Sequence, residues 1–599
     1  MKRCIAVLLS FTMVLSLAGC AKKEETTKKK KTKKTTKTEK TEDTDDTDET
    51  EPSESTQDPS ESTGDTSSTS ETSDTSDTSD TSDTADTSDP SDTSSPKNPY
   101  NMDIPKLSHD LELLTLTNHP EDRAYCEMAA NVDDRMLLIK EHYDVYEVEE
   151  PGYNILDETL NFYYNEALKA HKGLYDQGLQ DLQDVAENGN EDEVWDSYYQ
   201  EIYYELTILR ADSRVFSVID TEGAYLKDST SDSSLFYSID SQTGDYIEID
   251  DVITDRSAFA EVIKEYIETI DPEDYSTETA DYIASLETLI AAIEDPSNED
   301  IHFVLYQNAI RLFQPGSSAG EPTIFSITVP VLHLGNCVNL EYFTSTPEYY
   351  ALTADSNNEV YWDFDEDGDL DIVTVANTGD DYVPKLEISY NGQIIDSSAV
   401  DIADAYDISW VIMVYTDSGY YLYVELAEEN PTNSTHVFHL ENEDLKYVGR
   451  CEEIYEFPYN PTSVPVAFRS DLVGTGHFEV DCTLIGNNGL PDQTTSYFAK
   501  DALAVTVKDM TLGAYDINGD ATGDIVTVPA GTSVRLIGVD EAKEMAYFTT
   551  LNTDPSQNRN FKMLVYKDSY GQDPYDIDFD VYFDGEGAYE LFTGAPYFD

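Results

Sequence analysis

The residue types and spacing most suited to chemistry lie in a loop between residues 363 and 371. Five aspartates occupy its odd positions, namely Asp363, Asp365, Asp367, Asp369 and Asp371. Gly368 follows the third aspartate, where a chain that wraps an ion must bend sharply. Hard oxygen ligands at this spacing suit Ca²⁺, and Asp369 would offer its backbone carbonyl. The sequence therefore predicts a calcium site, and the alternative is an acidic turn without metal.

The flanks of this loop indicate what would position the ligands. An EF-hand needs a glutamate at its twelfth position, where Thr374 stands. Residues 360–362 and 372–375 are rich in β-branched and aromatic side chains, so we expect the loop to join two strands. A D-x-D-x-D-G-D-x-D loop between strands resembles the calcium loops of integrin-type (VCBS/FG-GAP) propeller blades.

Two later segments echo this loop. Residues 471–479 keep an acid at each end, Asp471 and Glu479, but the middle ligands are replaced, which indicates a degenerate blade without metal. Residues 516–524 could bind calcium, yet they run straight into a strand-like segment, so a turn is favoured over a metal site. The oxygen-bearing side chains of this last loop are Asp516, Asn518, Asp520 and Asp524.

The first hundred residues predict an anchor and a stalk. A basic start and a short apolar run end in Leu-Ala-Gly-Cys at residues 17–20, a bacterial lipobox. Cleavage before Cys20 and lipidation of its thiol would anchor the chain to the extracellular face of the cell membrane, whereas the apolar run is too short to span one. Residues 21–100 are rich in Lys and then in Ser, Thr and Asp, which predicts a disordered stalk. Such a stalk suggests a Gram-positive cell wall.

The formal net charge of −86 belongs mainly to the body of the protein. Of the 122 acidic residues, 100 lie between residues 101 and 599, against 23 of the 36 basic ones. Such a surface excludes nucleic-acid binding and favours cationic partners, which include Ca²⁺ and basic proteins. The lysines just after Cys20 would contact anionic headgroups, or would only keep the chain soluble.

Catalytic and cysteine patterns are weak. Residues 316–320 spell G-x-S-x-G, but a strand follows where a nucleophile elbow needs a helix. His436 and His439 are three apart on a predicted strand and should face opposite sides. We therefore expect that the chain is not an enzyme.

The chain has four cysteines besides Cys4 of the signal and the lipidated Cys20, namely Cys126, Cys337, Cys451 and Cys482. Their spacing forms no zinc pattern, and it leaves disulfides and buried free thiols as alternatives.

Residues 101–345 predict an α+β domain, an antiparallel sheet with packed helices. Apolar residues recur at three- and four-residue intervals over 154–185, which predicts an amphipathic helix with an interruption at Gly178. The other expected elements are strands at 135–148, 205–221 and 302–329, a hairpin at 235–249 around residues 241–244, and helices at 251–267 and 277–293.

The order of these segments resembles a known family. The segments "LRADSRVFSVI", "FYSIDSQTGDYIEIDDV" and "IHFVLYQNAIRLFQPGSSAGEPTIFSITVP" are similar to the RsiV/PdaC-type extracellular domain, over about residues 135–334. The resemblance implies an α+β fold. In RsiV-like proteins the domain recognises lysozyme, a basic protein, and in PdaC it accompanies a peptidoglycan deacetylase. The family's Gly-Gly-Ala-His segment reads Glu222 to Tyr225 here, so no role of that histidine is carried over.

The remaining sequence predicts all-β structure. Residues 346–500 would form a VCBS/FG-GAP-like module of propeller-like blades, with a hairpin at 407–426 and strands at 435–440 and 445–450. Residues 501–599 look like a small SH3-like barrel. With the signal at 1–20 and the stalk at 21–100, the chain is expected to be a lipid-anchored binding protein for a protein or cell-wall glycan, stabilised by Ca²⁺. The alternatives are an envelope-stress or lysozyme sensor and an accessory factor in peptidoglycan modification. A sensor of the RsiV kind normally carries a membrane-spanning helix. This chain is expected to have only a cleaved signal before its lipidated cysteine, and this difference argues against the sensor.

Overall fold

The computed structural model describes residues 106–593 with internal gaps. The gaps are residues 133–134, 228, 271–278, 299–300, 315–325, 379–384, 396–404, 429–432, 442–443, 471–475, 485–487, 493–502, 516–520, 541–542, 553–554 and 571–577. The lipobox with Cys20, the stalk, the G-x-S-x-G segment and most of the 471–479 and 516–524 loops lie outside the described residues. What the sequence indicates for them stays a prediction.

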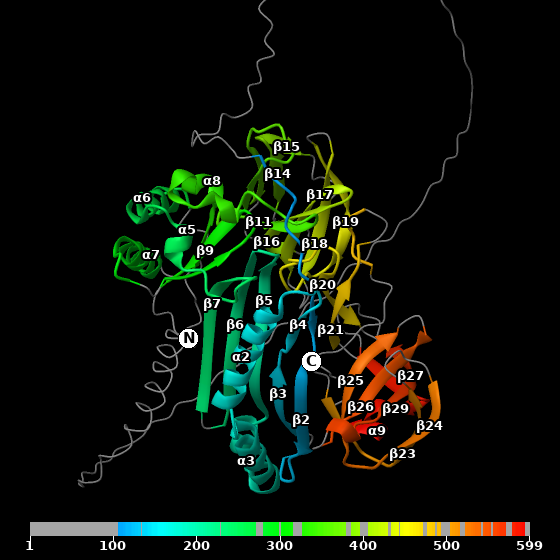
Figure 1. Ribbon diagram of the computed structural model, residues 1–599. Helices are drawn as coiled ribbons and strands as arrows, with labels where there is room; N and C mark the ends of the chain where they lie inside the picture. Colours follow the sequence, from blue (N-terminus) through cyan, green and yellow to red (C-terminus); the bar gives the residue numbers. More distant parts are fainter. Residues whose placement is uncertain are drawn as a thin grey trace, which may run out of the picture. The chain divides into compact units, whose positions relative to one another are not determined.

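A five-stranded sheet forms the first part of the described chain, in the order β2-β3-β5-β6-β7 (Figure 1). Helices α2 and α3 lie along one of its faces, where alternate strand residues such as Ile139, Ile202 and Tyr204 pack against Leu156 and Leu182. The elements here are β1 (Leu116–Asn118), β2 (Glu121–Met128), β3 (Met136–Tyr143), β4 (Tyr146–Val148), α2 (Asn154–Ala170), α3 (Leu174–Asn188), α4 (Glu191–Trp195), β5 (Tyr199–Ala211), β6 (Val215–Leu226) and β7 (Ser229–Asp240).

The other face of this sheet, here called the outer face, is polar and aromatic. Because side chains alternate along a strand, Lys140 lies opposite Glu201 on it, and Tyr203 lies opposite His142. The Lys140 ammonium is 2.6 Å from a Glu201 carboxylate oxygen. Near β2 the outer face meets the C-terminal sheet, where the Cys126 thiol lies 3.5 Å from Ser533 Oγ.

Three sequence-based expectations for this part need correction. Strand β3 pairs with β5 in parallel, so the sheet is mixed and not wholly antiparallel. The predicted helix is interrupted at Gly173, whose φ of 86° favours glycine, while Gly178 stays inside α3 and is buried. The expected return strand at 246–249 makes a single bridge, Tyr246 to Ile239, before a helix begins.

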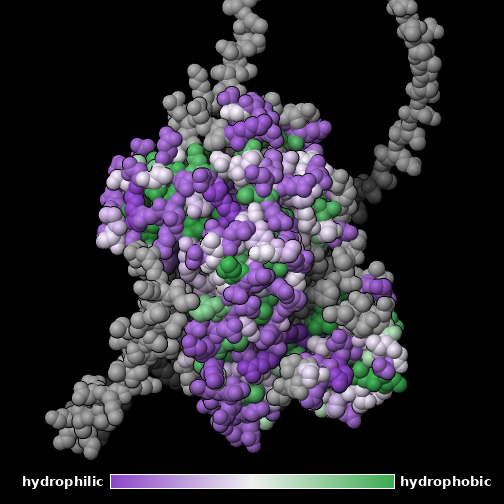
Figure 2. All heavy atoms as spheres, viewed as in Figure 1, coloured by the Kyte–Doolittle hydropathy of each residue, from purple (hydrophilic) through white to green (hydrophobic). Residues whose placement is uncertain are grey.

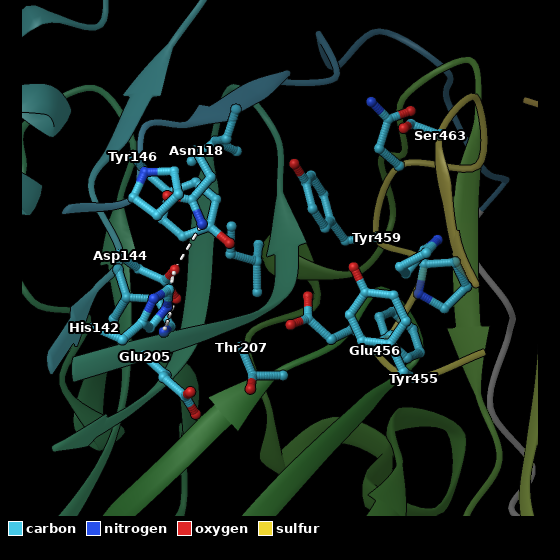
Figure 3. Close-up of a pocket in the computed structure, with 18 of the residues that line it drawn as sticks. Asn118, His142, Asp144, Tyr146, Glu205, Thr207, Tyr455, Glu456, Tyr459 and Ser463 are labelled. Atoms are coloured by element: carbon cyan, nitrogen blue, oxygen red, sulfur yellow. Dashed lines mark hydrogen bonds and ion pairs between the residues drawn. The ribbon is translucent and has the colours of Figure 1, made fainter. Parts of the chain in front are cut away.

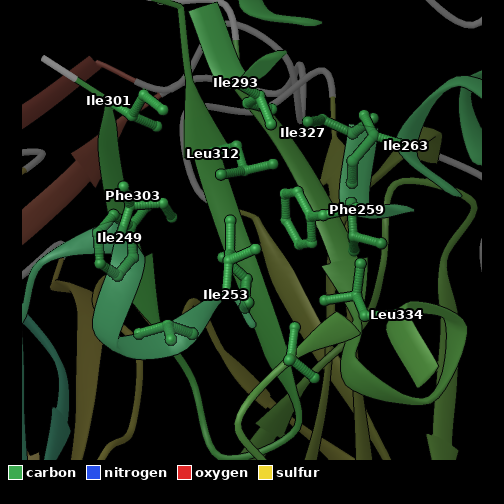
Figure 4. Close-up of a cluster of buried hydrophobic side chains, with 14 of the residues drawn as sticks. Ile249, Ile253, Phe259, Ile263, Ile293, Ile301, Phe303, Leu312, Ile327 and Leu334 are labelled. Carbon is green, nitrogen blue, oxygen red and sulfur yellow. The ribbon is translucent and has the colours of Figure 1, made fainter. Parts of the chain in front are cut away.

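A second group of elements packs helices against a three-stranded antiparallel sheet. Its core contains Phe259, Ile263, Ile293, Leu312 and Ile327, all at most 1% exposed (Figure 4). The closing strands appear where the sequence predicts them. The elements are α5 (Ile249–Val252), α6 (Arg256–Ile267), α7 (Thr279–Glu294), β8 (His302–Leu305), β9 (Ala309–Phe313), β10 (Ser326–Pro330), α8 (Val331–Leu334), η2 (Gly335–Cys337) and η3 (Leu340–Tyr342).

Two sheets follow, and both run antiparallel throughout. One has the order β11-β16-β17-β18-β19, and the other is the meander β12-β13-β14-β15. His436 and His439 both lie on β18 and face opposite sides: His439 stacks on Tyr421, and His436 contacts Tyr447. The strands are β11 (Tyr350–Thr353), β12 (Glu359–Trp362), β13 (Asp371–Asn377), β14 (Leu386–Tyr390), β15 (Gln393–Ile395), β16 (Ala405–Thr416), β17 (Gly419–Glu428), β18 (Ser434–Glu441) and β19 (Asp444–Glu452).

The C-terminal strands form an open sheet, not the closed small barrel that the sequence predicts. Its order is β24-β23-β27-β26-β25-β22-β30, and the end strands do not pair with each other among the described residues. Stacked rings of Phe548, Phe561 and Phe592 fill its core. A separate two-stranded sheet precedes it, formed by β20 (Val464–Ser470) and β21 (Gly476–Cys482). In the open sheet, β28 pairs with β27 and with β29 beside the main order. The elements of this part are β22 (Leu503–Thr506), β23 (Met510–Tyr515), β24 (Ala521–Val528), β25 (Ser533–Asp540), β26 (Met545–Thr550), η5 (Pro555–Gln557), β27 (Asn560–Tyr570), β28 (Asp578–Phe583), β29 (Glu586–Gly587), α9 (Ala588–Leu591) and β30 (Phe592–Thr593).

The described chain is therefore mostly β structure with a few helices. The face of the molecule in Figure 2 is largely hydrophilic over these elements. Cys126, Cys337, Cys451 and Cys482 are buried free thiols, which answers the question that their spacing left open. Among the described helices, none combines the length and the hydropathy that crossing a bilayer requires.

Candidate functional site

The aspartate loop joins strands β12 and β13, as its flanks predict. The two strands form an antiparallel hairpin in which Trp362 pairs with Asp371, so the first and last carboxylates of the loop lie at its base. Two residues have positive φ, Glu366 at 59° and Gly368 at 92°. The glycine therefore stands where the chain bends back, in a conformation that other side chains rarely adopt.

Three of the five predicted ligands come together. Asp363, Asp365 and Asp371 each offer a carboxylate oxygen, and these oxygens lie within 4.8 Å of one another. The group does not include the side chains of Asp367 and Asp369. Instead, Asp369 N–H donates to Asp367 Oδ1 at 2.7 Å, and Asp367 N–H donates to Asp365 Oδ1 at 3.1 Å, so both help to shape the turn.

Asp371 is held firmly by its surroundings. Phe364 N–H donates to its Oδ2 at 2.9 Å, and the Asn391 side-chain amide donates to its Oδ1 at 2.7 Å. Asn391 lies in the tight turn between β14 and β15, and its own Oδ1 accepts from Ile372 N–H at 2.9 Å. The turn that leads into the fourth strand of the meander thus fixes a carboxylate of the loop, a contact that no local sequence pattern signals.

Asp363 is the least satisfied member of the group. Its side chain is 7% exposed, its Oδ2 accepts from Gly368 N–H at 3.1 Å, and its buried Oδ1 has no hydrogen-bond partner. Burial raises the pKa of Asp363 to about 6, and the neighbouring carboxylates of Asp365, Asp367 and Asp371 push it the same way. Burial also raises the pKa of Asp365. A buried carboxylate oxygen that faces other carboxylates is a place where a cation would be stabilised.

The donor set fits a hard divalent cation. Every candidate ligand atom in the group is a carboxylate oxygen, and oxygen ligands with a flexible geometry are what Ca²⁺ takes. Asp363, Asp365 and Asp371 would hold the ion through their side chains. The backbone carbonyl of Asp369 remains the predicted further ligand.

A second feature was missed by the sequence analysis. A pocket of about 530 Å³, here called the acidic pocket, lies on the outer face of the first sheet. Its walls come from strands β1 to β5, from the segment between β19 and β20 with the start of β20, and from β25. The side chains that line it include Asp122, His142, Asp144, Tyr146, Glu205, Thr207, Tyr455, Glu456, Tyr459 and Arg535 (Figure 3).

An ion-pair chain crosses the floor of the acidic pocket. His142 Nδ1 is 2.6 Å from Asp122 Oδ1, and its Nε2 is 3.2 Å from Asp144 Oδ1. Burial lowers the pKa of His142, but the hydrogen bonds and charges of the two aspartates outweigh it and raise the pKa to about 10. Arg535 Nη1 donates to Asp122 Oδ2 at 3.1 Å. Both aspartates are therefore neutralised by cations of the protein itself.

Comparisons with known proteins give limited information. No family model matches the chain, and no curated protein matches it. A crystal structure of a DUF3298 family member from Bacteroides fragilis is similar with 11% identity and a TM-score of 0.26, covering 39% of this chain and 96% of that one. A DUF3298 family protein from Pseudomonas aeruginosa shows 12% identity and a TM-score of 0.24, covering 39% and 97%.

Proposed function

We propose that this chain is a lipid-anchored extracellular binding protein in which Ca²⁺ stiffens the hairpin of β12 and β13. The observation that carries the proposal is the buried Asp363 Oδ1, which lacks a hydrogen-bond partner and belongs to a cluster with Asp365 and Asp371. An unpaired buried carboxylate is costly, and a bound cation would remove that cost. Calcium would then act as a structural link and not as a catalyst.

The calcium link would tie together a whole sheet. The ligands lie at both ends of the 363–371 loop, and Asn391 connects one of them to the turn between β14 and β15. A four-stranded antiparallel meander is the unit from which propeller blades are built, so β12 to β15 are best interpreted as one such blade. Rigid β modules of this kind position binding surfaces without taking part in chemistry.

Anchoring and ligand recognition complete the proposal. The Leu-Ala-Gly-Cys segment supports lipidation of Cys20, and the stalk-like composition of residues 21–100 supports a head held away from a Gram-positive-type membrane. The net charge of −86 supports a cationic ligand such as a basic protein, while a cell-wall glycan is the other ligand class considered. The RsiV/PdaC-type interpretation of residues 135–334 belongs to this proposal, and no catalytic role is included in it.

Calorimetric titration of the full-length chain in detergent with CaCl₂ tests the metal part. We expect a saturable heat for the wild type and its loss in Asp363→Asn, because the substitution removes a charged ligand. Asp245→Asn, in the exposed turn that follows β7, is the matched control and should titrate like the wild type. Equal calcium heats in wild type and Asp363→Asn would refute calcium binding by this loop.

A further inference from the structure

Strand β7 forms one edge of the five-stranded sheet, at the opposite end from β2 (Figure 1). It pairs with β6 along its whole length, Ser229–Asp240, without a register shift. On its other side only the C-terminal end is covered. There Ile247 N–H donates to the Ser238 carbonyl at 2.9 Å, and Asp240 N–H donates to the Asp245 carbonyl at 2.9 Å. Among the described residues, no strand or bridge covers the N-terminal half of this edge.

The uncovered half of β7 presents backbone groups at every second residue. In an antiparallel strand the N–H and C=O of one residue point to the same side, and that side alternates along the chain. Because Ser238 and Asp240 bond away from β6, the N–H and C=O groups of Thr230, Asp232 and Ser234 also point away from it. Within the described part of the chain these groups have no hydrogen-bond partner. These three residues, here called the open edge, form a template for a further strand.

The open edge lacks the usual protection against strand pairing. Natural sheets protect their edges with lysines, prolines or bulges, whereas residues 229–235 read Ser-Thr-Ser-Asp-Ser-Ser-Leu. If two copies paired antiparallel about Asp232, their two carboxylates would lie opposite each other, which is destabilising. The 100 acidic and 23 basic side chains of residues 101–599 add repulsion between copies. The same charges favour a positively charged strand at this edge.

Two tyrosines of the neighbouring strands hold Asp232 in place. The Tyr203 hydroxyl donates to its Oδ1 at 3.0 Å, and the Tyr225 hydroxyl donates to its Oδ2 at 3.1 Å. The two rings are stacked, with centroids 5.9 Å apart and planes 15° from parallel. Gly223 permits this arrangement, since a Cβ there would lie 2.6 Å from the Tyr203 hydroxyl oxygen. Asp232 is therefore fixed beside two rings, and no cationic side chain of the described residues pairs with it.

We propose that the open edge of β7 binds an extended segment of a partner protein that contains Lys or Arg, and that this segment adds a sixth strand to the sheet. Main-chain hydrogen bonds would supply affinity, and alternate side chains would supply specificity. A Lys or Arg opposite Asp232 would share its face of the sheet, where opposite charges on adjacent strands are stabilising. The ring of Tyr225, which is 37% exposed, attracts cations as well. This binding mode rests on the proposed role of the chain as a binding protein and gives that role a surface.

The test uses the full-length chain in detergent, titrated with the blocked peptide acetyl-Thr-Lys-Thr-Lys-Thr-Lys-Thr-amide. We expect saturable binding, and at least about tenfold weaker binding of two control peptides. One control has glutamate in place of each lysine, which reverses the charge. The other is N-methylated at every residue, which keeps the charge but removes the hydrogen bonds that a strand donates. Hydrogen exchange of residues 229–236, followed by mass spectrometry, should slow with the lysine peptide alone, because its backbone would cover the edge amides.

A matched pair of variants tests the charge at the open edge. Asp232→Asn removes this charge and keeps a hydrogen-bond partner for both tyrosine hydroxyls, so we expect it to weaken binding of the lysine peptide about fivefold. Glu265→Gln, at an exposed position on α6, makes the same change in net charge and should bind like the wild type. Both variants must keep the wild-type circular dichroism spectrum. The comparison of the three peptides on the wild type does not depend on either variant.

Several outcomes would overturn strand addition by a basic segment. Equal binding of the N-methylated peptide, unchanged exchange of residues 229–236, or wild-type affinity in folded Asp232→Asn would each do so. A dimer that protects residues 229–236 without peptide would assign the edge to a second copy. Binding of the lysine peptide that persists in EGTA leaves the open edge standing even if the calcium proposal fails. Calcium heats without binding of the lysine peptide would refute the edge proposal alone.

Discussion

Buried carboxylates are the recurring residue-scale feature of this acidic protein. Burial raises the pKa of Asp220 and Asp355 to about 7 and that of Glu425 to about 7. Asp220 accepts hydrogen bonds from Tyr204 and Tyr237, so it is stabilised without an ion. Asp363 differs from Asp220, because its buried Oδ1 has no donor and the neighbouring charges that raise its pKa are those of carboxylates. This contrast is why the metal proposal rests on Asp363 and not on acidity in general.

The pH dependence of stability should reveal Asp220. Its pKa in the folded chain, about 7, lies above the ordinary value of 3.8. The folded state therefore holds the proton more tightly than the unfolded state, and the resulting stability is present below about pH 4 and lost as pH rises through 7. About three units of pKa correspond to on the order of 4 kcal/mol.

We expect Asp220→Asn to gain unfolding free energy relative to the wild type as pH rises from 4 to 8, because the amide cannot acquire the buried charge. Urea unfolding of both proteins at several pH values measures this. Asp245→Asn, an exposed turn residue, should track the wild type at every pH. A difference between Asp220→Asn and wild type that does not change with pH would contradict the assignment.

At the scale of elements, local patterns predicted much of the fold. The β-branched flanks of the aspartate loop predicted β12 and β13, and the three- and four-residue spacing from Leu156 predicted the helical region. The strands β8 to β10 and the hairpin of β16 and β17 also appear where periodicity places them. In each case the pattern and its pairing partner lie close together in the sequence.

The missed features depend on distant partners. Parallel pairing of β3 with β5 is set by the α2–α3 connection that lies between them in the chain, and period-two alternation looks the same in either direction. The acidic pocket unites Asp122, Tyr455 and Arg535, which no local window contains. A usable signal was the alternation of Tyr199, Glu201, Tyr203 and Glu205, which indicates a polar and aromatic strand face.

The break between α2 and α3 depends on a residue in the left-handed conformation. Gly173 has a φ of 86°, and a Cβ at this position would meet no atom within 4 Å. The cost of Gly173→Ala should therefore be purely conformational, about 1 kcal/mol of unfolding free energy. Its exposed neighbour supplies the control, since Lys172→Ala should change stability much less. Urea unfolding measures both, and a Gly173→Ala variant as stable as the wild type would show that the break does not need a left-handed residue.

Charge is the dominant property of the whole molecule. Residues 101–599 hold 100 acidic and 23 basic side chains, so the negative charges of this part of the chain repel one another. A few ion pairs offset this locally, such as the buried one in which Arg210 Nε donates to Asp212 Oδ2 at 2.6 Å. Most of the excess charge has no basic side chain to balance it, because there are far too few. Dissolved cations must therefore contribute to the stability of the folded state.

This self-repulsion predicts a strong salt dependence. Raising NaCl from about 10 mM to about 500 mM at pH 8 shortens the Debye length from roughly 30 Å to a few ångströms. We expect the urea midpoint in the presence of EGTA to rise steadily over this range, because screening weakens repulsion more in the compact state than in the expanded one. The same series at pH 4 is the control, since protonation of many carboxylates removes much of the repulsion. A midpoint that is independent of NaCl at pH 8, or that rises equally at both pH values, would mean that local pairing and not screening balances the charge of the body.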